Sequence, residues 1–252
     1  MKNTEKFTEK AKHYEVGRPS YAQELIDCLY HNYNLNSQSI IADIGAGTGK
    51  LTKQLLQKGS RVIAVEPNDA MRSIAQQGLQ EYDTIQIVNG TDVATTLSDQ
   101  SIDVITVAQA FHWFDAALFQ KECARILKAN GKVFLIWNMR DENAPVNKET
   151  YEIFQKYCPN FYGFSGGIQQ DDANITTFFH HDYVIEKFPN PLFFSKDTFL
   201  QRALSASYSL KDGDPQFEEY VQTLTALYDK YEKNGLLEVP NDSVAYIGTP
   251  FK

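Results

Sequence analysis

The sequence lacks the features that mark secreted and membrane-spanning proteins. Its 252 residues include only three cysteines, Cys28, Cys123 and Cys158, which are too far apart for a disulfide framework or a Cys-x-x-Cys metal site. No apolar run approaches the roughly 20 residues that span a bilayer. The first residues also lack the apolar centre of a signal peptide. We therefore expect a cytoplasmic protein with no membrane partner.

Basic residues are also fewer than acidic residues. Lys and Arg number 24 against 32 Asp and Glu, which gives a net charge of −8, and no run of five like charges occurs. Nucleic-acid binding depends on clustered basic residues, so we expect a small-molecule substrate and no nucleic acid. The adjacent His180 and His181 would point to opposite faces of a strand, so we expect no metal site. The sequence allows a monomer or a homodimer.

Short apolar runs alternate with helical periodicity between residues 39 and 137. This pattern predicts βαβ units, and hence an α/β fold with a doubly wound, mostly parallel sheet. Gly59 and Gly131 stand where glycines end the predicted helices. The predicted strands are 39–44, 61–66, 85–88, 103–107 and 132–137.

The pattern changes beyond residue 140, where 20 of the 32 aromatic residues lie. A helix that begins with Asp214 as its N-cap and Pro215 in its first turn is predicted there. The other elements expected in this part are helices near 151–157 and 196–206 and strands at 183–188 and 243–247.

A glycine-rich loop follows the first predicted strand, in the run from Asp43 to Gly49, Asp-Ile-Gly-Ala-Gly-Thr-Gly. Such a loop presents backbone N–H groups and a helix N-terminus to a ligand. It is not a Walker loop, because Ile44 and Leu51 occupy the positions where that motif needs Gly and Ser or Thr. It is not a dinucleotide fingerprint either, because Lys50 replaces the third glycine.

Two acidic residues indicate the kind of ligand. Asp43 precedes the first glycine by two residues, and a carboxylate there favours a positively charged ligand over a pyrophosphate. Glu66 ends the next strand, where an acid can accept both hydroxyls of a ribose. A cationic nucleoside satisfies both conditions, and S-adenosylmethionine is such a molecule.

Residues 7 to 140 resemble a class I S-adenosylmethionine-dependent methyltransferase. The run DIGAGTGKLT resembles the first motif of that family. Residues 125–131, RILKANG, resemble the segment that in this family ends a helix and leads into the fifth strand. More narrowly, the residues from Phe7 to Tyr21 and the run AQAFHWFD at 108–115 are similar to the small-molecule branch. That branch includes trans-aconitate methyltransferase-like proteins with a methyltransferase type 11 domain.

The resemblance implies a Rossmann-like, seven-stranded fold with a C-terminal α/β cap or extension. Residues 1–38 would form an arm and helix covering the cofactor, 39–140 the cofactor-binding core, and 141–252 the rest of the sheet and a substrate cap. Within the arm, Tyr14 and Arg18 would contact the methionine end of the cofactor. The full set of expected cofactor contacts is Tyr14, Arg18, Asp43, Gly45, Ala46, Gly47, Gly49, Glu66, Pro67, Met71, Thr91, Asp92, Val93, Gln109 and Ala110.

The expected activity is methyl transfer from S-adenosylmethionine to an O, N or carboxylate atom of a small molecule by in-line displacement, with S-adenosylhomocysteine as product. His112 is the candidate general base. Substrate contacts are expected from His112, Trp113, Asn138, Arg140, Phe161 and Tyr162. A non-catalytic S-adenosylmethionine-binding module and a methyltransferase acting on a macromolecule are alternatives. A nicotinamide dehydrogenase would need the glycine that Lys50 replaces.

Overall fold

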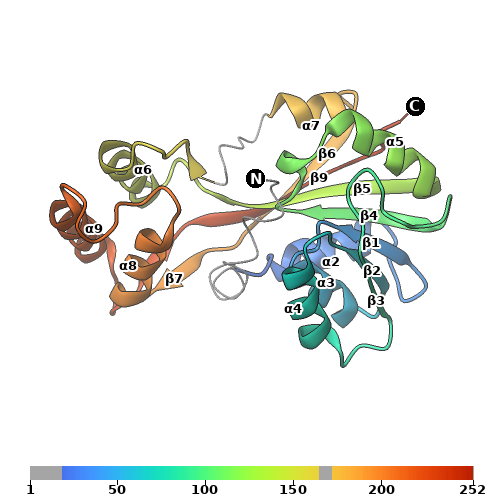
Figure 1. The fold of residues 1–252 in the computed structure, drawn as a ribbon, viewed down its shortest axis with the longest axis horizontal. Helices are drawn as coiled ribbons and strands as arrows, with labels where there is room; N and C mark the ends of the chain where they lie inside the picture. Colours follow the sequence, from blue (N-terminus) through green and yellow to red (C-terminus); the bar gives the residue numbers. More distant parts are fainter. Residues whose placement is uncertain (1–18, 165–171, 252) are drawn as a thin grey trace. The chain divides into compact units, whose positions relative to one another are not determined.

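The computed structural model describes residues 19–164 and 172–251 (Figure 1). Tyr14 and Arg18 lie outside the described residues, so their roles stay predictions. The described residues form two compact units. The first contains residues 19–137, 172–188 and 243–251, and the second contains residues 138–164 and 189–242.

A seven-stranded sheet with the order β3-β2-β1-β4-β5-β9-β6 forms the centre of the fold. Strand β1 pairs in parallel with β2 and β4, β2 with β3, and β4 with β5, as the alternating pattern predicts. The doubly wound, mostly parallel α/β fold is thereby confirmed. The strands are β1 (Ile40–Ile44), β2 (Arg61–Val65), β3 (Ile85–Val88), β4 (Ile102–Ala108), β5 (Leu127–Arg140), β6 (Tyr183–Pro189) and β9 (Asn241–Gly248).

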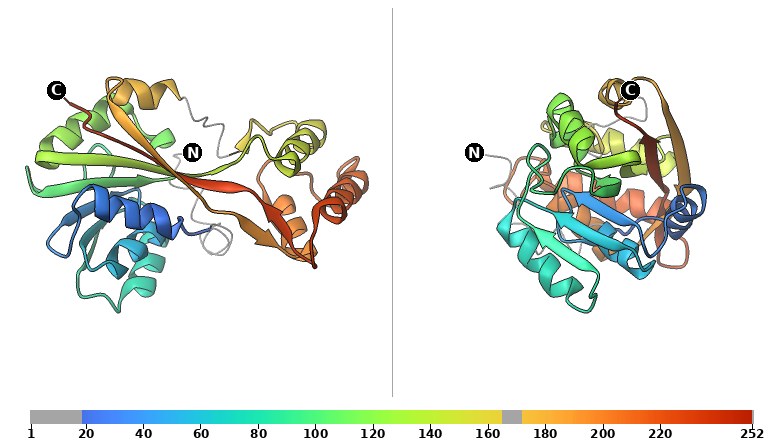
Figure 2. Two further views of the ribbon diagram at one scale, coloured as in Figure 1. Left: turned by 180° about the vertical axis from the view of Figure 1, so that it is seen from behind. Right: turned by 90° about the vertical axis from the view of Figure 1, so that its right-hand side faces the viewer.

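Helices cover both faces of the sheet within the first unit (Figures 1 and 2). Helices α2, α3 and α4 lie over one face, and α5 and α7 lie over the other. Because both faces are covered, the central strands are continuous apolar runs rather than alternating ones. The helical elements are α2 (Gln23–Asn32), α3 (Lys50–Gln57), α4 (Asp69–Leu79), the short 3-10 helix η2 (Phe111–Trp113), α5 (Ala116–Ile126) and α7 (Ala173–Phe178).

The second unit has its own core, which accounts for much of the aromatic excess. Strand β7 (Leu192–Phe194) pairs antiparallel with β8 (Leu237–Val239). Helices α6 (Pro145–Tyr157) and α8 (Lys196–Ser205) both contact α9 (Phe217–Tyr231). The buried side chains shared by these elements include Phe154, Tyr157, Phe199, Tyr220, Leu224, Tyr228 and Leu237.

The two predicted helix-ending glycines have different environments. Gly59 follows α3 with a φ of +85°, and its N–H donates to the Leu56 carbonyl at 2.8 Å, which confirms the prediction. Gly131 lies inside β5, so its prediction is wrong. A Cβ on Gly131 would lie 2.6 Å from Leu127 Cδ2 and 3.1 Å from the carbonyl oxygens of Asp103 and Lys128, so the packing around Gly131 is tight.

The predicted start of α9 at Asp214 and Pro215 is also wrong. The helix begins at Phe217 and follows Gln216, whose φ of +67° is left-handed. The Asp214 carboxylate accepts a hydrogen bond from the Lys211 N–H at 2.7 Å, so it stabilises the preceding turn instead of capping the helix.

Glu122 on α5 connects this helix to the segment after β3. Its carboxylate accepts hydrogen bonds from the Thr95 N–H at 2.8 Å, the Thr95 hydroxyl at 2.6 Å and Arg125 Nη2 at 2.7 Å. Burial raises the pKa of Glu122, but the bonds from Arg125 and Thr95 outweigh burial and lower the pKa to about 2.

We expect Glu122→Gln to lower the free energy of unfolding by about 1–3 kcal/mol near neutral pH, because charge-assisted hydrogen bonds are lost. The pKa of Glu122 lies lower in the folded than in the unfolded state, so the stabilisation is present above its ordinary pKa of 4.5 and disappears as the pH falls toward 2. Urea denaturation at several pH values should therefore show the difference from wild type shrinking in acid.

Asp99→Asn is the matched control for this substitution. Asp99 also bonds Arg125, at 2.6 Å, but its side chain is 76% exposed, so the expected loss is below about 1 kcal/mol. Equal losses in the two variants, or a difference independent of pH, would contradict the assignment.

Candidate cofactor-binding site

The glycine-rich loop after β1 is crowded at Gly45 and open at Gly47. The N–H of Gly45 donates to the Val65 carbonyl at 2.8 Å, and Gly45 has a left-handed φ of +71°. A Cβ on Gly45 would lie 2.8 Å from the Cβ of Ala110, so only glycine fits. A Cβ added to Gly47 would meet no atom within 4 Å, so the backbone there faces open space.

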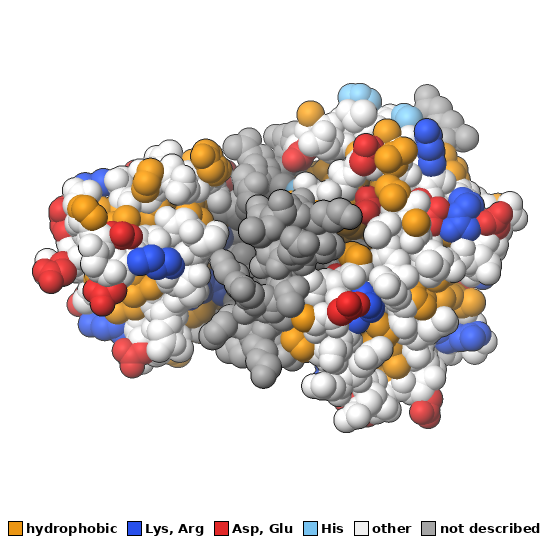
Figure 3. Space-filling model, in the orientation of Figure 1, with side chains coloured by type: hydrophobic (Ala, Val, Ile, Leu, Met, Phe, Trp, Pro, Cys, Tyr) orange, Lys and Arg blue, Asp and Glu red, His pale blue; other side chains and the backbone are white. Residues whose placement is uncertain are grey.

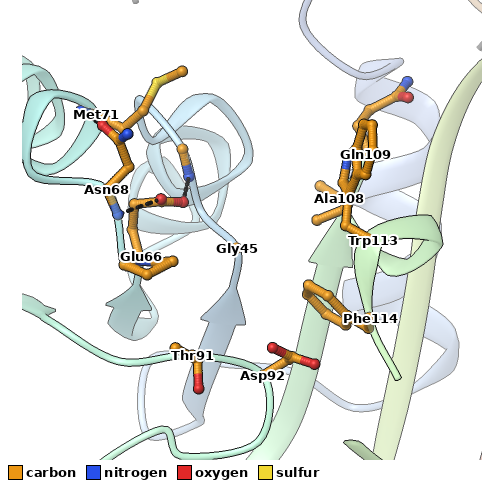
Figure 4. A pocket seen from close by; sticks show the side chains of 13 residues that line it. Gly45, Glu66, Asn68, Met71, Thr91, Asp92, Ala108, Gln109, Trp113 and Phe114 are labelled. Atoms are coloured by element: carbon orange, nitrogen blue, oxygen red, sulfur yellow. Dashed lines mark hydrogen bonds between the residues drawn. The ribbon is translucent and has the colours of Figure 1, made fainter. Parts of the chain in front are cut away.

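Glu66 follows β2 and holds this loop (Figure 4). One carboxylate oxygen accepts from the Gly47 N–H at 2.9 Å, and the other accepts from the Asn68 N–H at 2.8 Å. Burial raises the pKa of Glu66, while these two N–H groups and the charge of Arg72 oppose that effect. Each oxygen keeps a further lone pair, so the carboxylate can still accept the two hydroxyls of a ribose.

Asp43 is fully enclosed at the end of β1 and does not line the pocket. Its carboxylate accepts hydrogen bonds from the hydroxyls of Thr52, at 2.5 Å, and Thr106, at 2.9 Å. Burial raises its pKa to about 6, although the two hydroxyls act in the opposite direction. Asp43 thus links β1 to α3 and β4 through these bonds. Its contact with the cofactor stays a prediction.

The opposite wall of the pocket comes from the end of β4 and from η2 (Figure 4). Gln109 has a left-handed φ of +56°, which is strained for a residue with a side chain, and its N–H donates to the Ile136 carbonyl at 2.9 Å. Trp113 is 52% exposed although it lines the pocket, and Phe114 lies beside it. This wall therefore contains Gln109 and two aromatic rings.

The pocket between these walls has a volume of about 230 Å³. Nine of the expected cofactor contacts line it: Gly45, Gly47, Glu66, Pro67, Met71, Thr91, Asp92, Gln109 and Ala110. Trp113, expected to contact substrate, also lines it. Three further lining residues, Asn68, Ala108 and Phe114, were not predicted from the sequence. Asn68 could have been recognised in the sequence as an N-cap, since Asn is favoured at that position. It is the N-cap of α4, and its side chain accepts a hydrogen bond from the Met71 N–H at 3.0 Å.

Other expected cofactor and catalytic residues lie outside the lining. Ala46 does not line the pocket, and Gly49 caps α3, where a Cβ would lie 2.8 Å from Leu79 Cδ1. Val93 is 42% exposed beside the lining residue Asp92. His112 lies in η2 with its ring 4.7 Å from that of Trp113, and its catalytic role stays a prediction.

Four expected substrate contacts belong to the second unit. Asn138 is buried and accepts a hydrogen bond from Asn190 Nδ2 at 3.0 Å. Phe161 is buried in the aromatic core, whereas Tyr162 is 83% exposed. Arg140 ends β5 and lies over the ring of Phe164. The structure describes their surroundings, and their contact with a substrate stays a prediction.

Two further features were sought in the part of the chain that the structure describes: metal-ion clusters and membrane-spanning helices. Within residues 19–164 and 172–251, no three His, Cys, Asp or Glu side chains are grouped to hold a metal ion. Over the same residues, no helix combines the length and apolar character needed to cross a membrane.

The fold is Rossmann-like, and comparison with known proteins shows what it is similar to. Residues 42–135 match the family described as "Methyltransferase domain". A solved structure from Anaeromyxobacter dehalogenans, described as a "Putative Type II Methyltransferase", superposes with a TM-score of 0.67 at 19% identity. The superposition covers 93% of this chain and 98% of that one, which shows a shared fold.

Curated relatives match the core in sequence. An "Uncharacterized methyltransferase" of Mycobacterium tuberculosis is 41% identical over 140 residues, which are 56% of this chain and 55% of the relative. A "Probable S-adenosylmethionine-dependent methyltransferase" of Saccharomyces cerevisiae is 28% identical over 153 residues, 59% of this chain and 52% of the relative. The match thus spans about half the length of these relatives. Residues 42–135 thus carry a methyltransferase domain, and S-adenosylmethionine is the cofactor that this domain implies.

We expect Gly45→Ala to weaken S-adenosylmethionine binding at least about tenfold and to destabilise the fold by about 1–2 kcal/mol, because of the left-handed φ and the clash with Ala110. Calorimetric titration and urea denaturation measure the two effects. Adding Ala110→Gly removes the atom that clashes, so the double variant should recover part of the loss. No recovery would show that the contact with Ala110 does not matter.

Asp43→Asn should change how stability depends on pH. Because the pKa of Asp43 is raised on folding, the folded protein still holds this proton between about pH 4 and 6, where the unfolded chain has released it. Wild type should therefore lose stability relative to Asp43→Asn as the pH rises through this window. A constant difference between the two proteins over that window and up to neutral pH would contradict the raised pKa.

Proposed function

We propose that the whole chain transfers a methyl group from S-adenosylmethionine to an O, N or carboxylate atom of a small-molecule acceptor. The observation that carries this proposal is the Glu66 carboxylate, which is tied to the glycine-rich loop and faces the pocket. When bound, S-adenosylmethionine supplies a methyl group activated by a sulfonium charge. The residues of the chain then mainly position the reactants and exclude water.

The residues that line the pocket would contact different parts of S-adenosylmethionine and of the acceptor. Glu66 accepts the ribose hydroxyls, and the half-buried Asp92 is placed to accept from the exocyclic amine of the adenine. Trp113 and Phe114 supply an apolar surface for the base or for the acceptor. A carboxylate acceptor needs no general base, whereas a hydroxyl or amine benefits from one, and His112 is the first candidate.

The surface charges support a small acceptor. The net charge of −8 repels phosphates, and the face in Figure 3 carries acidic and basic side chains intermixed rather than a continuous basic patch. The three cysteines are all free thiols, which supports a reducing, cytoplasmic location. We propose a monomer or homodimer that binds neither nucleic acid nor membranes.

The binding half of this proposal is tested by titrating wild type and Glu66→Gln with S-adenosylmethionine in a calorimeter. The variant loses charge-assisted hydrogen bonds to the ribose, so its affinity should fall at least about tenfold. Glu81→Gln is the matched control, because the Glu81 side chain is 65% exposed and does not line the pocket. Absence of binding to wild type, or equal affinities for the Glu66 variant and the control, would refute the assignment.

The catalytic half is tested by following S-adenosylhomocysteine release on fractionated cell extract. The expected result is turnover with the small-molecule fraction that Glu66→Gln lowers. Turnover with the RNA or protein fraction alone would favour a macromolecular acceptor. Tight binding of S-adenosylmethionine without turnover on any fraction would favour a non-catalytic module.

A further inference from the structure

Arg72 on α4 binds the main chain at the end of β2. Its Nη1 donates to the Glu66 carbonyl at 2.8 Å and to Asn89 Oδ1 at 3.3 Å. Asn89 follows β3, which pairs with β2, so one guanidinium joins the segments after two neighbouring strands. The Arg72 side chain is only 14% exposed, yet it does not line the cofactor pocket.

The geometry of α4 brings Arg72 to this place. Its N–H donates to the carbonyl of the N-cap residue Asn68 at 3.0 Å, so Arg72 lies one turn into the helix. Long side chains on a helix lean toward its N-terminus, and here the segment that contains Glu66 precedes that terminus. The preceding residue, Met71, lines the pocket. Helix α4 therefore supplies one side chain to the pocket and the next one to the main chain of a lining residue.

The main chain of Glu66 is held on both sides. Strand β2 pairs with β3 as far as Val65 and Val88, and the Glu66 N–H donates to the Val88 carbonyl at 3.2 Å. The Glu66 carbonyl lies beyond these pairs and accepts from Arg72 instead. Because the main chain sets the direction in which a side chain leaves it, these two bonds fix where the Glu66 carboxylate begins.

The ion pair of Arg72 with Asp69 does not account for this arrangement. The Asp69 side chain is 91% exposed, and exposed ion pairs contribute little to stability. A positive charge near a helix N-terminus is also disfavoured by the helix dipole. The bonds to Glu66 and Asn89 are therefore the contacts that hold the guanidinium. Burial raises the pKa of Glu66, and the charge of Arg72 opposes that rise.

We propose that Arg72 is a positioning residue for the cofactor, because it holds the main chain of Glu66 so that the carboxylate meets both ribose hydroxyls. This inference rests on the proposed function, since it requires S-adenosylmethionine to bind with its ribose at Glu66. The effect of Arg72 is then selective. Its loss should weaken the contacts of the ribose hydroxyls and leave those of the adenine and of the amino-acid part of the cofactor.

The test titrates the full chain in a calorimeter with S-adenosylhomocysteine and with its dideoxy analogue, which lacks both ribose hydroxyls. Wild type should bind S-adenosylhomocysteine at least about tenfold more tightly than the analogue. Arg72→Met should weaken S-adenosylhomocysteine at least about fivefold and the analogue less than about twofold. Arg72→Lys should recover part of the loss, because an ammonium group can still donate to the Glu66 carbonyl.

Asp69→Asn is the matched control. It removes the exposed partner of Arg72 and keeps the bonds to Glu66 and Asn89, so both affinities should stay within about twofold of wild type. Thermal unfolding of each variant shows whether it is folded. If Arg72→Met does not fold, Asn89→Ala removes the other partner of Nη1 and should give a smaller loss that again affects S-adenosylhomocysteine more than the analogue.

The proposal is overturned if the folded Arg72 or Asn89 variants weaken both ligands by the same factor, or if they leave both affinities unchanged. It is also overturned if Asp69→Asn causes the same loss as Arg72→Met. Absence of S-adenosylhomocysteine binding in wild type would refute the proposed function, and this inference with it. Discrimination between the two ligands in wild type that Arg72→Met leaves intact would refute only the role of Arg72.

Discussion

The hydrogen bond from the Gly47 backbone to the Glu66 carboxylate is the interaction on which the cofactor pocket depends. It joins the loops that follow two adjacent parallel strands, β1 and β2, at the edge where ligands of open α/β sheets bind. The same carboxylate accepts from Asn68, which begins α4, so one side chain fixes the loop, the strand end and the next helix. The close approach of Gly45 to Ala110 then sets the distance to the opposite wall.

Sequence periodicity predicted the sheet well because parallel strands buried on both faces must be apolar and must alternate with helices. Nine of the expected cofactor contacts line one pocket, since a glycine loop and an acid at the next strand end lie at the same edge of any such sheet. The surroundings of Asp43 could not be predicted in this way. The hydroxyls of Thr52 and Thr106, which lie on other elements, bond its carboxylate in the folded chain.

Other predictions differ from the structure for reasons that the local sequence does not show. Gly131 resembles a helix end in sequence, yet it lies within β5 and packs tightly against Leu127. The start of α9 was misplaced because Gln216 adopts a left-handed φ that no propensity favours. Phe114 was missed as a lining residue because three aromatic residues occur between 111 and 114, and the sequence does not show which of them face a pocket and which pack in the core. In each case tertiary contacts decided between conformations that the local sequence leaves open.

The two units differ in how they use charge and aromatic surface. In the first unit Glu122 pairs with Arg125, and the pocket is lined by backbone, two carboxyl groups and two aromatic rings. In the second unit Arg140 lies over the ring of Phe164, and Arg202 lies over the ring of Phe194.

A crystal structure of the protein grown with S-adenosylhomocysteine tests the central claim most directly. We predict that both ribose hydroxyls donate to the Glu66 carboxylate, with the adenine against Asp92 and the wall that contains Trp113 and Phe114. A ligand bound elsewhere, or bound in this pocket with its ribose away from Glu66, would contradict that claim.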